Sequence, residues 1–447
     1  MLNQIERVSL KFEDLIKKRD PIKVLASGYL VYMICGFLLL LLPFSTIKVV
    51  SLIDNLFTAV SAVSTTGLVT IDPGQSYSFF GELVILILIQ LGGIGYMTFG
   101  SFIILQTGHR ISKTREKMTR TAFPLPESLD ISSFIKGVLF FTVAVEFIGA
   151  VLLSIFFWLE GLNNPIWNGI FHSISAFCTA GFSLNPDSFE SFANHLQINV
   201  ILSILSMLGA IGFIVAVDFW LKITNKRKHL LFTSKVILLI TSVFLVGGTA
   251  VFYLIEPSIA NMPFEEKLLV SFFQIMTSTS TVGFNTIDIG SLSTSSIMLL
   301  YFLMIFGASP SGTGGGLKST TFSALFSLVK GTLKRSEVIS SMGRKIPAKR
   351  LQFACSSFVF CGFILGLSIF FLGLTENAEF EILVFEAISA LGTVGMSMGL
   401  TGSLSSIGKC IIIVLMIIGR IGVLTFGLAV STIDSGEPVD GDCDLVV

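Results

Sequence analysis

The chain has 447 residues, of which 52% are hydrophobic and 13% are charged, and its 29 Lys and Arg side chains equal its 29 Asp and Glu side chains. Soluble globular proteins carry about 25% charged residues, so this composition excludes an ordinary soluble domain and predicts a polytopic protein of the lipid bilayer. The zero net charge identifies no partner, and we expect no nucleic acid to be one.

Long and short apolar runs alternate along the chain. The long runs predict transmembrane helices, whereas the short runs cannot cross a membrane core of about 30 Å and predict re-entrant helices. In chain order, the long, short and long runs are 24–43, 52–63 and 79–106; 134–159, 166–177 and 195–221; 236–255, 265–278 and 295–329; and 351–373, 380–391 and 407–430.

A polar, glycine-rich stretch follows each short run. It obeys the pattern F-x3-[ST]-x5-G, with Thr two residues before Gly, at 57–67, 171–181, 273–283 and 385–395. T-x-G alone is a weak signal because it also occurs at Thr98, Thr313 and Thr425. Four helix caps with packing glycines would not explain the equal placement of the full pattern after four short helices, which indicates an internal repeat.

The repeats predict the architecture. We expect an all-α polytopic membrane protein with four tandem repeats of first helix, pore loop and second helix around a central pore. It would have eight transmembrane helices and four re-entrant pore helices. The repeats are expected at 23–107, 108–222, 223–333 and 334–430, between a cytosolic N-terminus at 1–22 and a cytosolic tail at 431–447.

Basic residues gather in alternate connections. The N-terminus, 108–136, 222–235 and 330–350 hold 24 of the 29 Lys and Arg side chains. The positive-inside rule therefore predicts cytoplasmic termini and puts all four T-x-G stretches at the outer side of the plasma membrane. We expect the outer carboxylates to attract cations together, although any one of them could be a solvated loop residue without a role. Examples are Asp54, Asp72, Asp187, Glu190, Glu265, Glu266, Asp288, Glu376, Glu379 and Glu381.

The T-x-G stretches contain the residue types that a monovalent cation needs. A dehydrated cation requires several oxygen ligands, which backbone carbonyls supply without a buried counter-charge. Glycine permits unusual backbone angles, Thr adds a hydroxyl oxygen, and "TVGF" and "TVGM" are close to the TVGYG filter of potassium channels. The predicted K⁺ filter residues are Ser64, Thr65, Thr66, Gly67, Cys178, Thr179, Ala180, Gly181, Ser280, Thr281, Val282, Gly283, Gly392, Thr393, Val394 and Gly395.

The second long run of the third repeat alone is interrupted by a glycine-rich stretch, "GASPSGTGGGLKS" at 307–319. With Pro310 it cannot be continuous helix, and at about 1.5 Å per residue it lies near mid-membrane. We interpret it as a gate beneath the filter, as the family resemblance that these motifs carry implies, rather than as a packing kink or hinge without a gating role. The gate candidates are Gly307, Gly312, Thr313, Gly314, Gly315, Gly316, Lys318 and Arg420.

Three of the charges inside the long apolar runs are candidates for a role. Arg420 lies at the matching depth of the fourth repeat, and because a buried charge is costly we expect it beside the 307–316 stretch, where it sets the closed state. Lys318 either lines the same cavity or snorkels toward the cytoplasmic surface. Glu146, in the first helix of the second repeat, is either half of a structural ion pair or a functional site.

With these four stretches, and with "IQLGGIGYMTFG" at 89–100 and "IIGRIGVLTF" at 417–426, the chain resembles the Trk/Ktr/HKT superfamily of potassium transporters, closest to the bacterial Ktr type. The resemblance covers about 22–430. It implies K⁺ uptake, passive or coupled to an ion such as Na⁺, and no organic cofactor. It also implies a homodimer and control by a cytosolic nucleotide-binding ring made by a separate protein. In the plant branch, Ser at the first-repeat position goes with Na⁺ selectivity, so Gly67 favours K⁺.

Two rival functions are weighed against K⁺ uptake. A secondary transporter or channel for another monovalent cation such as Na⁺ stays open, but inverted repeats with charged midplane ligands are missing from the pattern. An intramembrane enzyme would need His, Asp and Glu constellations inside the membrane. Only four histidines occur, at 109, 172, 195 and 229, and neither GxSxG nor HExxH is present, so we expect no enzyme.

Overall fold

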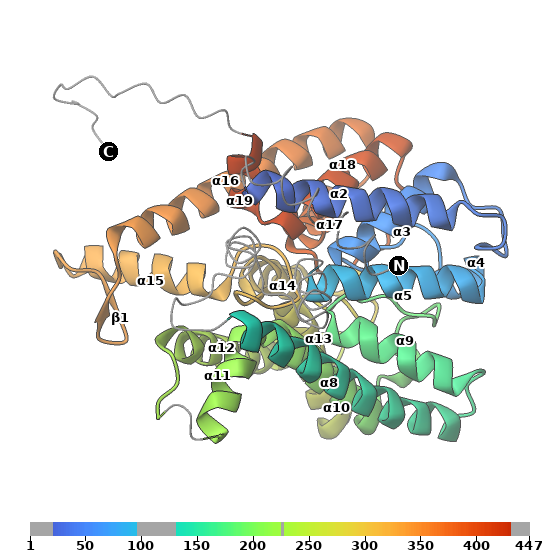
Figure 1. Cartoon of the computed structure of the whole chain (residues 1–447), viewed down its shortest axis with the longest axis horizontal. Helices are drawn as coiled ribbons and strands as arrows, with labels where there is room; N and C mark the ends of the chain where they lie inside the picture. The colour runs from blue at the N-terminus through green and yellow to red at the C-terminus, as the bar shows by residue number, and fades with distance from the viewer. Residues whose placement is uncertain (1–20, 96–130, 225–227, 431–447) are drawn as a thin grey trace, which may run out of the picture.

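The computed structural model describes residues 21–95, 131–224 and 228–430, which are almost entirely helical (Figure 1). Strand pairing in these segments is limited to one antiparallel hairpin, β1 (Ser340–Ser341) and β2 (Arg344–Lys345). The helical fold class is therefore confirmed for the described segments. The predictions for 1–20, 96–130 and 431–447 lie outside them.

The helices follow the predicted apolar runs in order. The first helices are α2 (Pro21–Leu40), α8 (Ile131–Leu159), α12 (Phe232–Ile255) and α16 (Ala348–Thr375). The short helices are α3 (Leu52–Ser64), α9 (Pro165–Phe177), α13 (Phe264–Ser280) and α17 (Phe380–Gly392). The second helices are α5 (Phe79–Ile94), α10 (Leu196–Ile211), α14 (Thr294–Phe306) and α18 (Ser406–Ile421). The other elements are α4 (Pro73–Ser76), α11 (Phe213–Ile223), α15 (Ser319–Leu333), α19 (Val423–Val430) and the 3₁₀ turns η1 (Glu190–Phe192), η2 (Ile289–Ser291) and η3 (Thr401–Ser403).

The second helices begin at a polar N-cap. The hydroxyl oxygens of Ser78, Ser293 and Ser405 accept backbone N–H groups of the first turn of α5, α14 and α18, at 3.3, 3.4 and 3.0 Å. In α10 the cap is His195, whose Nδ1 accepts the N–H of Ile198 at 3.3 Å. Because caps satisfy otherwise free N–H groups, these residues fix where each second helix starts.

Fewer described helices can cross a membrane alone than the sequence predicts. By length and composition three suffice in the described residues, α8 from Phe134, α12 and α16, or four if α10 and α11 count as one span bent by 94°. The other five helices predicted to span the membrane are shorter among the described residues: α2 is apolar over Ala26–Leu40, α5, α10 and α18 have 16 residues each, and α14 has 13.

The long runs 195–221 and 407–430 are predicted to be transmembrane helices, but each of them is also interrupted. The chain breaks between α10 and α11 at Gly212 and between α18 and α19 at Gly422, where φ is 99° and 95°. Glycine tolerates these angles without the steric cost of a Cβ atom. The break predicted in the third repeat is confirmed, and it separates α14 from α15 by residues 307–318.

The short helices lie between elements of different repeats. Each packs on the first helix of its own repeat: α3 on α2, α9 on α8, α13 on α12 and α17 on α16. Each also packs on a second helix that precedes it in the chain (α9 on α5, α13 on α10, α17 on α14), and α3 closes the series on α18. The Phe residues of the repeated pattern anchor this packing, because Phe57, Phe171, Phe273 and Phe385 are fully buried.

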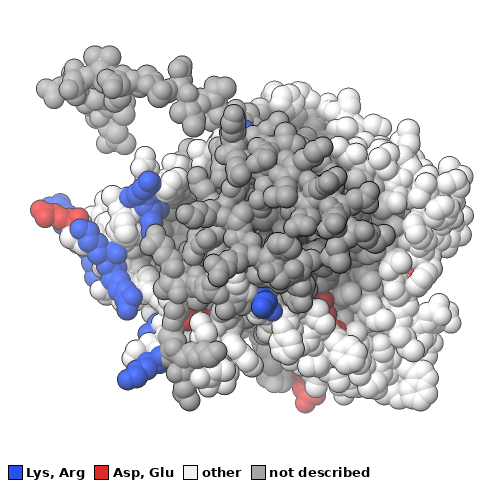
Figure 2. Space-filling view, viewed as in Figure 1, with Lys and Arg blue, Asp and Glu red and all other residues white. Residues whose placement is uncertain are grey.

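Charged and apolar surfaces are separated. Figure 2 shows Lys and Arg side chains gathered at one end of the molecule, over α15, the hairpin and the start of α16. The outward faces of α8 and α16 instead expose large apolar side chains, for example Phe140, Phe147 and Val359 at 74%, 68% and 70%. Apolar helix faces of this kind suit contact with lipid tails.

Candidate functional site

A Thr in the left-handed backbone region follows each of the four short helices, and the φ angles of Thr65, Thr179, Thr281 and Thr393 are 52°, 49°, 60° and 50°. This Thr is the cap residue of α3, α13 and α17, whereas in α9 it comes one residue after the cap, Cys178. Glycine normally occupies this position, and a β-branched residue there is a genuine outlier. Strain of this kind costs about 1–3 kcal/mol per residue and persists at sites where the backbone shape has a function.

Backbone hydrogen bonds hold the strained turns. The residue after each Thr donates its N–H to the carbonyl five residues earlier, at 2.8 to 3.1 Å, as in a Schellman cap. The acceptors are the Ser and Thr positions of the sequence pattern, namely Ser61, Ser175, Thr277 and Ser389. In the first and fourth copies the hydroxyl also accepts the N–H of the pattern's glycine, Gly67 or Gly395, at 3.1 Å. The repeated Ser or Thr therefore serves to shape the loop.

The four T-x-G loops, residues 64–67, 178–181, 280–283 and 392–395, form a closed ring. A Cβ atom on Gly67 would overlap the carbonyl oxygen of Ala180 in the next loop. The same holds for Gly181 with Val282, Gly283 with Val394, and Gly395 with Thr66. The four glycine φ angles lie between 66° and 93°. Glycine is needed both for the backbone angle and for the close approach. The structure thus brings the sixteen predicted filter residues together.

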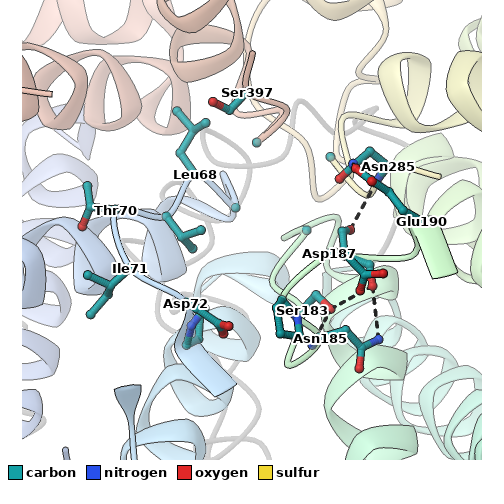
Figure 3. Close-up of a pocket in the computed structure, with 18 residues that line it drawn as sticks. Leu68, Thr70, Ile71, Asp72, Ser183, Asn185, Asp187, Glu190, Asn285 and Ser397 are labelled. Atoms are coloured by element: carbon teal, nitrogen blue, oxygen red, sulfur yellow. Dashed lines mark hydrogen bonds between the residues drawn. The ribbon is translucent and has the colours of Figure 1, made fainter. Parts of the chain in front are cut away.

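A cavity of about 330 Å³ lies on one side of this ring (Figure 3). It is lined by the glycines of all four T-x-G loops and by the residues that follow them. Of the ten outer carboxylates named from the sequence, Asp72, Asp187 and Glu190 line it. Asn285 donates to Glu190 at 2.7 Å, and burial, followed by Asp288 and Asp187, raises the pKa of Glu190 above its ordinary value. The three carboxylates give this side of the ring a negative character.

The inner loop, residues 307–318, lies against the threonines of the ring. The Thr313 hydroxyl pairs with that of Thr179 at 2.9 Å, and the Thr65 hydroxyl donates to the Thr313 carbonyl at 3.2 Å. Gly315 N–H donates to the Thr393 hydroxyl at 2.7 Å. A Cβ atom on Gly314 would overlap the Thr281 hydroxyl. One segment of the third repeat therefore contacts the strained Thr of all four repeats.

Four glycines of the second helices make this closeness possible. Gly92, Gly209, Gly307 and Gly419 each lie so near a short helix that a Cβ atom would overlap one of its last carbonyl oxygens. The carbonyls belong to Val63, Phe177, Thr279 and Leu391, four residues before the glycine of each T-x-G loop. These glycines follow the T-x-G glycine of their own repeat by 25, 28, 24 and 24 residues, so the same close contact recurs at nearly the same spacing.

Arg420 lies beside the inner loop, as predicted. Its guanidinium donates to the Thr65 hydroxyl at 2.8 Å and to the carbonyls of Thr313 and Gly92. It therefore joins α18, the first T-x-G loop, α5 and the inner loop. A planar guanidinium with five donors suits such a junction better than an ammonium group.

Lys318 does not snorkel to a surface. Its ammonium donates to the carbonyls of Gly314 and Gly315 at 2.7 and 3.1 Å, within its own loop. These carbonyls lack helical partners because the loop is not a helix. Lys318 therefore stabilises the loop conformation that contacts the ring.

Ser311 is a contact that sequence reasoning missed. The helix α11 begins after Gly212 without a capping side chain of its own. Ser311 supplies the cap from the inner loop: its carbonyl accepts the N–H of Phe213 at 3.2 Å and its hydroxyl accepts the N–H of Ile214 at 3.0 Å. The sequence carries no signal for this contact, because the run 195–221 that contains Gly212 reads as one uninterrupted apolar segment.

Comparisons with known proteins agree with this architecture. A model of the TrkH family, described as cation transport protein, matches residues 22–439. The chain is 38% identical to Ktr system potassium uptake protein B of Bacillus subtilis (strain 168) over 417 residues, which are 91% of this chain and 92% of that one. It is 34% identical to the potassium/sodium uptake protein NtpJ of Enterococcus hirae over 421 residues, 92% of each.

A solved structure shares the fold. The chain aligns with the crystal structure of the potassium transporter TrkH from Vibrio parahaemolyticus at a TM-score of 0.70, with 20% identity, over 91% of this chain and 85% of that one. The extent of the family match and the identity to several full-length relatives leave one assignment: the chain belongs to the TrkH family of cation transport proteins.

Proposed function

We propose that this chain takes up K⁺ across the plasma membrane, and that the ring of T-x-G loops is its selectivity filter. The observation that carries the proposal is the closed succession of contacts from Gly67 to Ala180, Gly181 to Val282, Gly283 to Val394 and Gly395 to Thr66. A ring of backbone carbonyls from four loops is the arrangement that replaces the hydration shell of K⁺ in potassium channels. The names of the relatives, which refer to potassium uptake, support the same ion.

The inner loop is the gate of this proposal. It fills the space beside all four strained Thr residues, and Arg420 and Lys318 hold it there. A cation that leaves the ring on this side would meet the loop and two positive side chains. Uptake therefore requires the loop to move, and the gating interpretation is favoured over a packing kink.

The membrane orientation follows from charge. The basic end over α15 and the hairpin faces the cytoplasm, the negative cavity faces outward, and both termini are cytoplasmic. The M1–pore loop–M2 repeats are 23–107, 108–222, 223–333 and 334–430. A homodimer and a separate cytosolic nucleotide-binding regulator belong to the same proposal, and they rest on the family resemblance.

Na⁺ is the second candidate, as a co-transported or alternative ion. It is favoured by one observation, the name of the relative NtpJ, a potassium/sodium uptake protein. The two candidates differ in a single assay, ion flux into proteoliposomes with K⁺, with Na⁺ and with both. K⁺ uptake that is independent of Na⁺, without uptake of Na⁺ when it is the only cation supplied, would leave only the first candidate.

The filter is tested by Gly67→Ser in cells without K⁺ uptake of their own, because Ser there would crowd Ala180. We expect the preference for Rb⁺ or K⁺ over Na⁺ to fall by about tenfold, the effect of about 1.4 kcal/mol. Gly161→Ser is the matched control, since Gly161 also has a positive φ, 74°, but no neighbour within 4 Å. If Gly67→Ser protein is present in the membrane and its preference for K⁺ over Na⁺ is unchanged, the T-x-G ring is not the selectivity filter.

A further inference from the structure

Three polar side chains meet behind the second T-x-G loop. Glu146 of α8 accepts the Gln90 amide of α5 at 2.9 Å and lies 3.8 Å from the thiol sulfur of Cys178. That sulfur is also 3.6 Å from the Gln90 amide oxygen. Both Glu146 and Cys178 are buried. Of the two interpretations of Glu146 left open by the sequence, its contacts favour the functional site, because its partners among the described residues are an amide and a thiol.

The next interface of the ring is apolar at the same positions. Gln90 lies two residues before Gly92, so its counterpart before Gly209 is Met207. Gly149 contacts Ser173 and Gly248 contacts Ile275, and each contacted residue lies eight positions before its T-x-G glycine. Gly149 and Gly248 are therefore equivalent. Since Glu146 lies three residues before Gly149, its counterpart is Leu245. Met207 and Leu245 pack on the cluster that contains Val282. Packing at this depth therefore does not require polar groups.

A carboxylate there is expensive. Burial of a charge without a cationic partner costs several kcal/mol, and an ionisable group at membrane depth is a functional-site hypothesis by default. The backbone around it is fixed as well, because the Glu146 carbonyl accepts the Ser173 hydroxyl of α9 at 2.7 Å. The side chain is therefore held at a set place behind the loop.

The cluster reaches the ring through Cys178. This residue directly precedes Thr179, whose φ is 49°, and Ala180, whose carbonyl meets Gly67. A Cβ atom on Gly93 would come within 2.6 Å of the Cys178 sulfur, so the thiol has little room. A change at the Glu146 carboxyl group is therefore expected to move Cys178. Because Ala180 is two residues further along the same loop, its carbonyl, which contacts Gly67, would move as well.

We propose that Glu146 is a positioning residue for binding of the transported monovalent cation. Its carboxyl group accepts hydrogen bonds from Gln90 and Cys178, and so holds Cys178 where the second T-x-G loop keeps its shape. The inference rests on the proposed function of the ring, and it makes the support of the second T-x-G loop polar where that of the third is apolar. A change at Glu146 is therefore expected to alter the affinity for the transported ion and the preference between ions.

The test is Glu146→Gln, which keeps the shape and replaces one of the two accepting carboxyl oxygens with an amide group. In proteoliposomes we expect the K⁺ concentration for half-maximal uptake to rise by about tenfold, because a buried donor is left without its acceptor, while the maximal rate stays within about twofold. A merely structural role would lower the amount of active protein and leave the half-saturating concentration unchanged. Glu160→Gln is the matched control, because Glu160 follows the same helix and is partly exposed.

A second variant keeps the proposal testable if Glu146→Gln does not fold. Cys178→Ala removes the link between Glu146 and the loop, so it should raise the half-saturating K⁺ concentration in the same direction, and the double variant should be no worse than the stronger single one. Additive effects, or unchanged affinity in both variants, would overturn the proposal. The two proposals can fail separately. An unchanged ion preference in Gly67→Ser would contradict the proposed filter. A changed ion preference in Gly67→Ser, with an unchanged half-saturating K⁺ concentration in Glu146→Gln, would contradict only the role of Glu146.

Discussion

The T-x-G ring and the inner loop lie against each other but are built in opposite ways. The ring is made of four copies with the same hydrogen-bonded turn, nearly the same Thr angle and the same glycine contact. The inner loop occurs once, and its contacts are each made once, through Ser311, Thr313, Lys318 and Arg420. Equal copies around an axis suit recognition of a spherical ion. A single asymmetric segment suits a switch, because it can move without taking the ring apart.

The largest effect is expected from a change to the ring. Gly283→Ala places a Cβ atom against the Val394 carbonyl at a φ of 86°. Strain of about 1–3 kcal/mol at such a site would cut K⁺ uptake by up to about a hundredfold and lower the thermal unfolding midpoint in detergent. Gly161→Ala, with a positive φ and open surroundings, should leave uptake unchanged. Equal losses in both would show that the ring contact has no special role.

A change to the inner loop is expected to raise the uptake rate, whereas a change to the ring lowers it. Deletion of residues 312–316 removes the contacts with Thr179 and Thr393, so the closed state loses its support. The maximal uptake rate should rise by about tenfold with ion preference retained, since the ring is left in place. Flux measurements in proteoliposomes check both quantities. A maximal rate equal to that of the unmodified protein would contradict a gating role for the inner loop.

A smaller effect in the same direction is expected from Ser311→Ala. Loss of the cap for the Ile214 N–H costs about 1 kcal/mol, so the uptake rate should rise by about fivefold if α11 holds the loop closed. Ser309→Ala is the matched control in the same loop, because the Ser309 hydroxyl contacts Ser319 rather than α11. A similar rise in both variants would argue against a link to α11.

The smallest effect is expected outside both regions, at the negative entrance. The raised pKa of Glu190 means that its carboxylate takes up a proton at a higher pH than an ordinary Glu. Uptake at low K⁺ concentration should therefore decline as the outer pH falls through that pKa, by about twofold at low ionic strength and less at high salt. Glu190→Gln should remove this part of the pH dependence. An unaltered pH profile would contradict a steering role.

The sequence predicted what is repeated. The short helices, their buried Phe residues and the four T-x-G stretches could be found because each occurs four times in one register. Arg420 could be placed beside the inner loop because a buried charge needs acceptors and the loop has free carbonyls.

Contacts made only once could not be predicted. The break at Gly212 lies in an unremarkable apolar run, and it is stabilised by Ser311 from nearly one hundred residues away. Gln90 and Glu146 come from different repeats, so their meeting behind Cys178 requires knowledge of which helices pack together. The direction of Lys318 depended likewise on the fold of its own loop.

The central claim is that the four T-x-G loops bind the transported cation together. Anomalous X-ray scattering from crystals grown with Rb⁺ in place of K⁺ tests it most directly. The account predicts Rb⁺ peaks inside the ring, between the carbonyls of residues 64–67 and those of the other three loops, with a weaker signal in Gly67→Ser crystals. Peaks only elsewhere in the protein, with uptake activity intact, would contradict it.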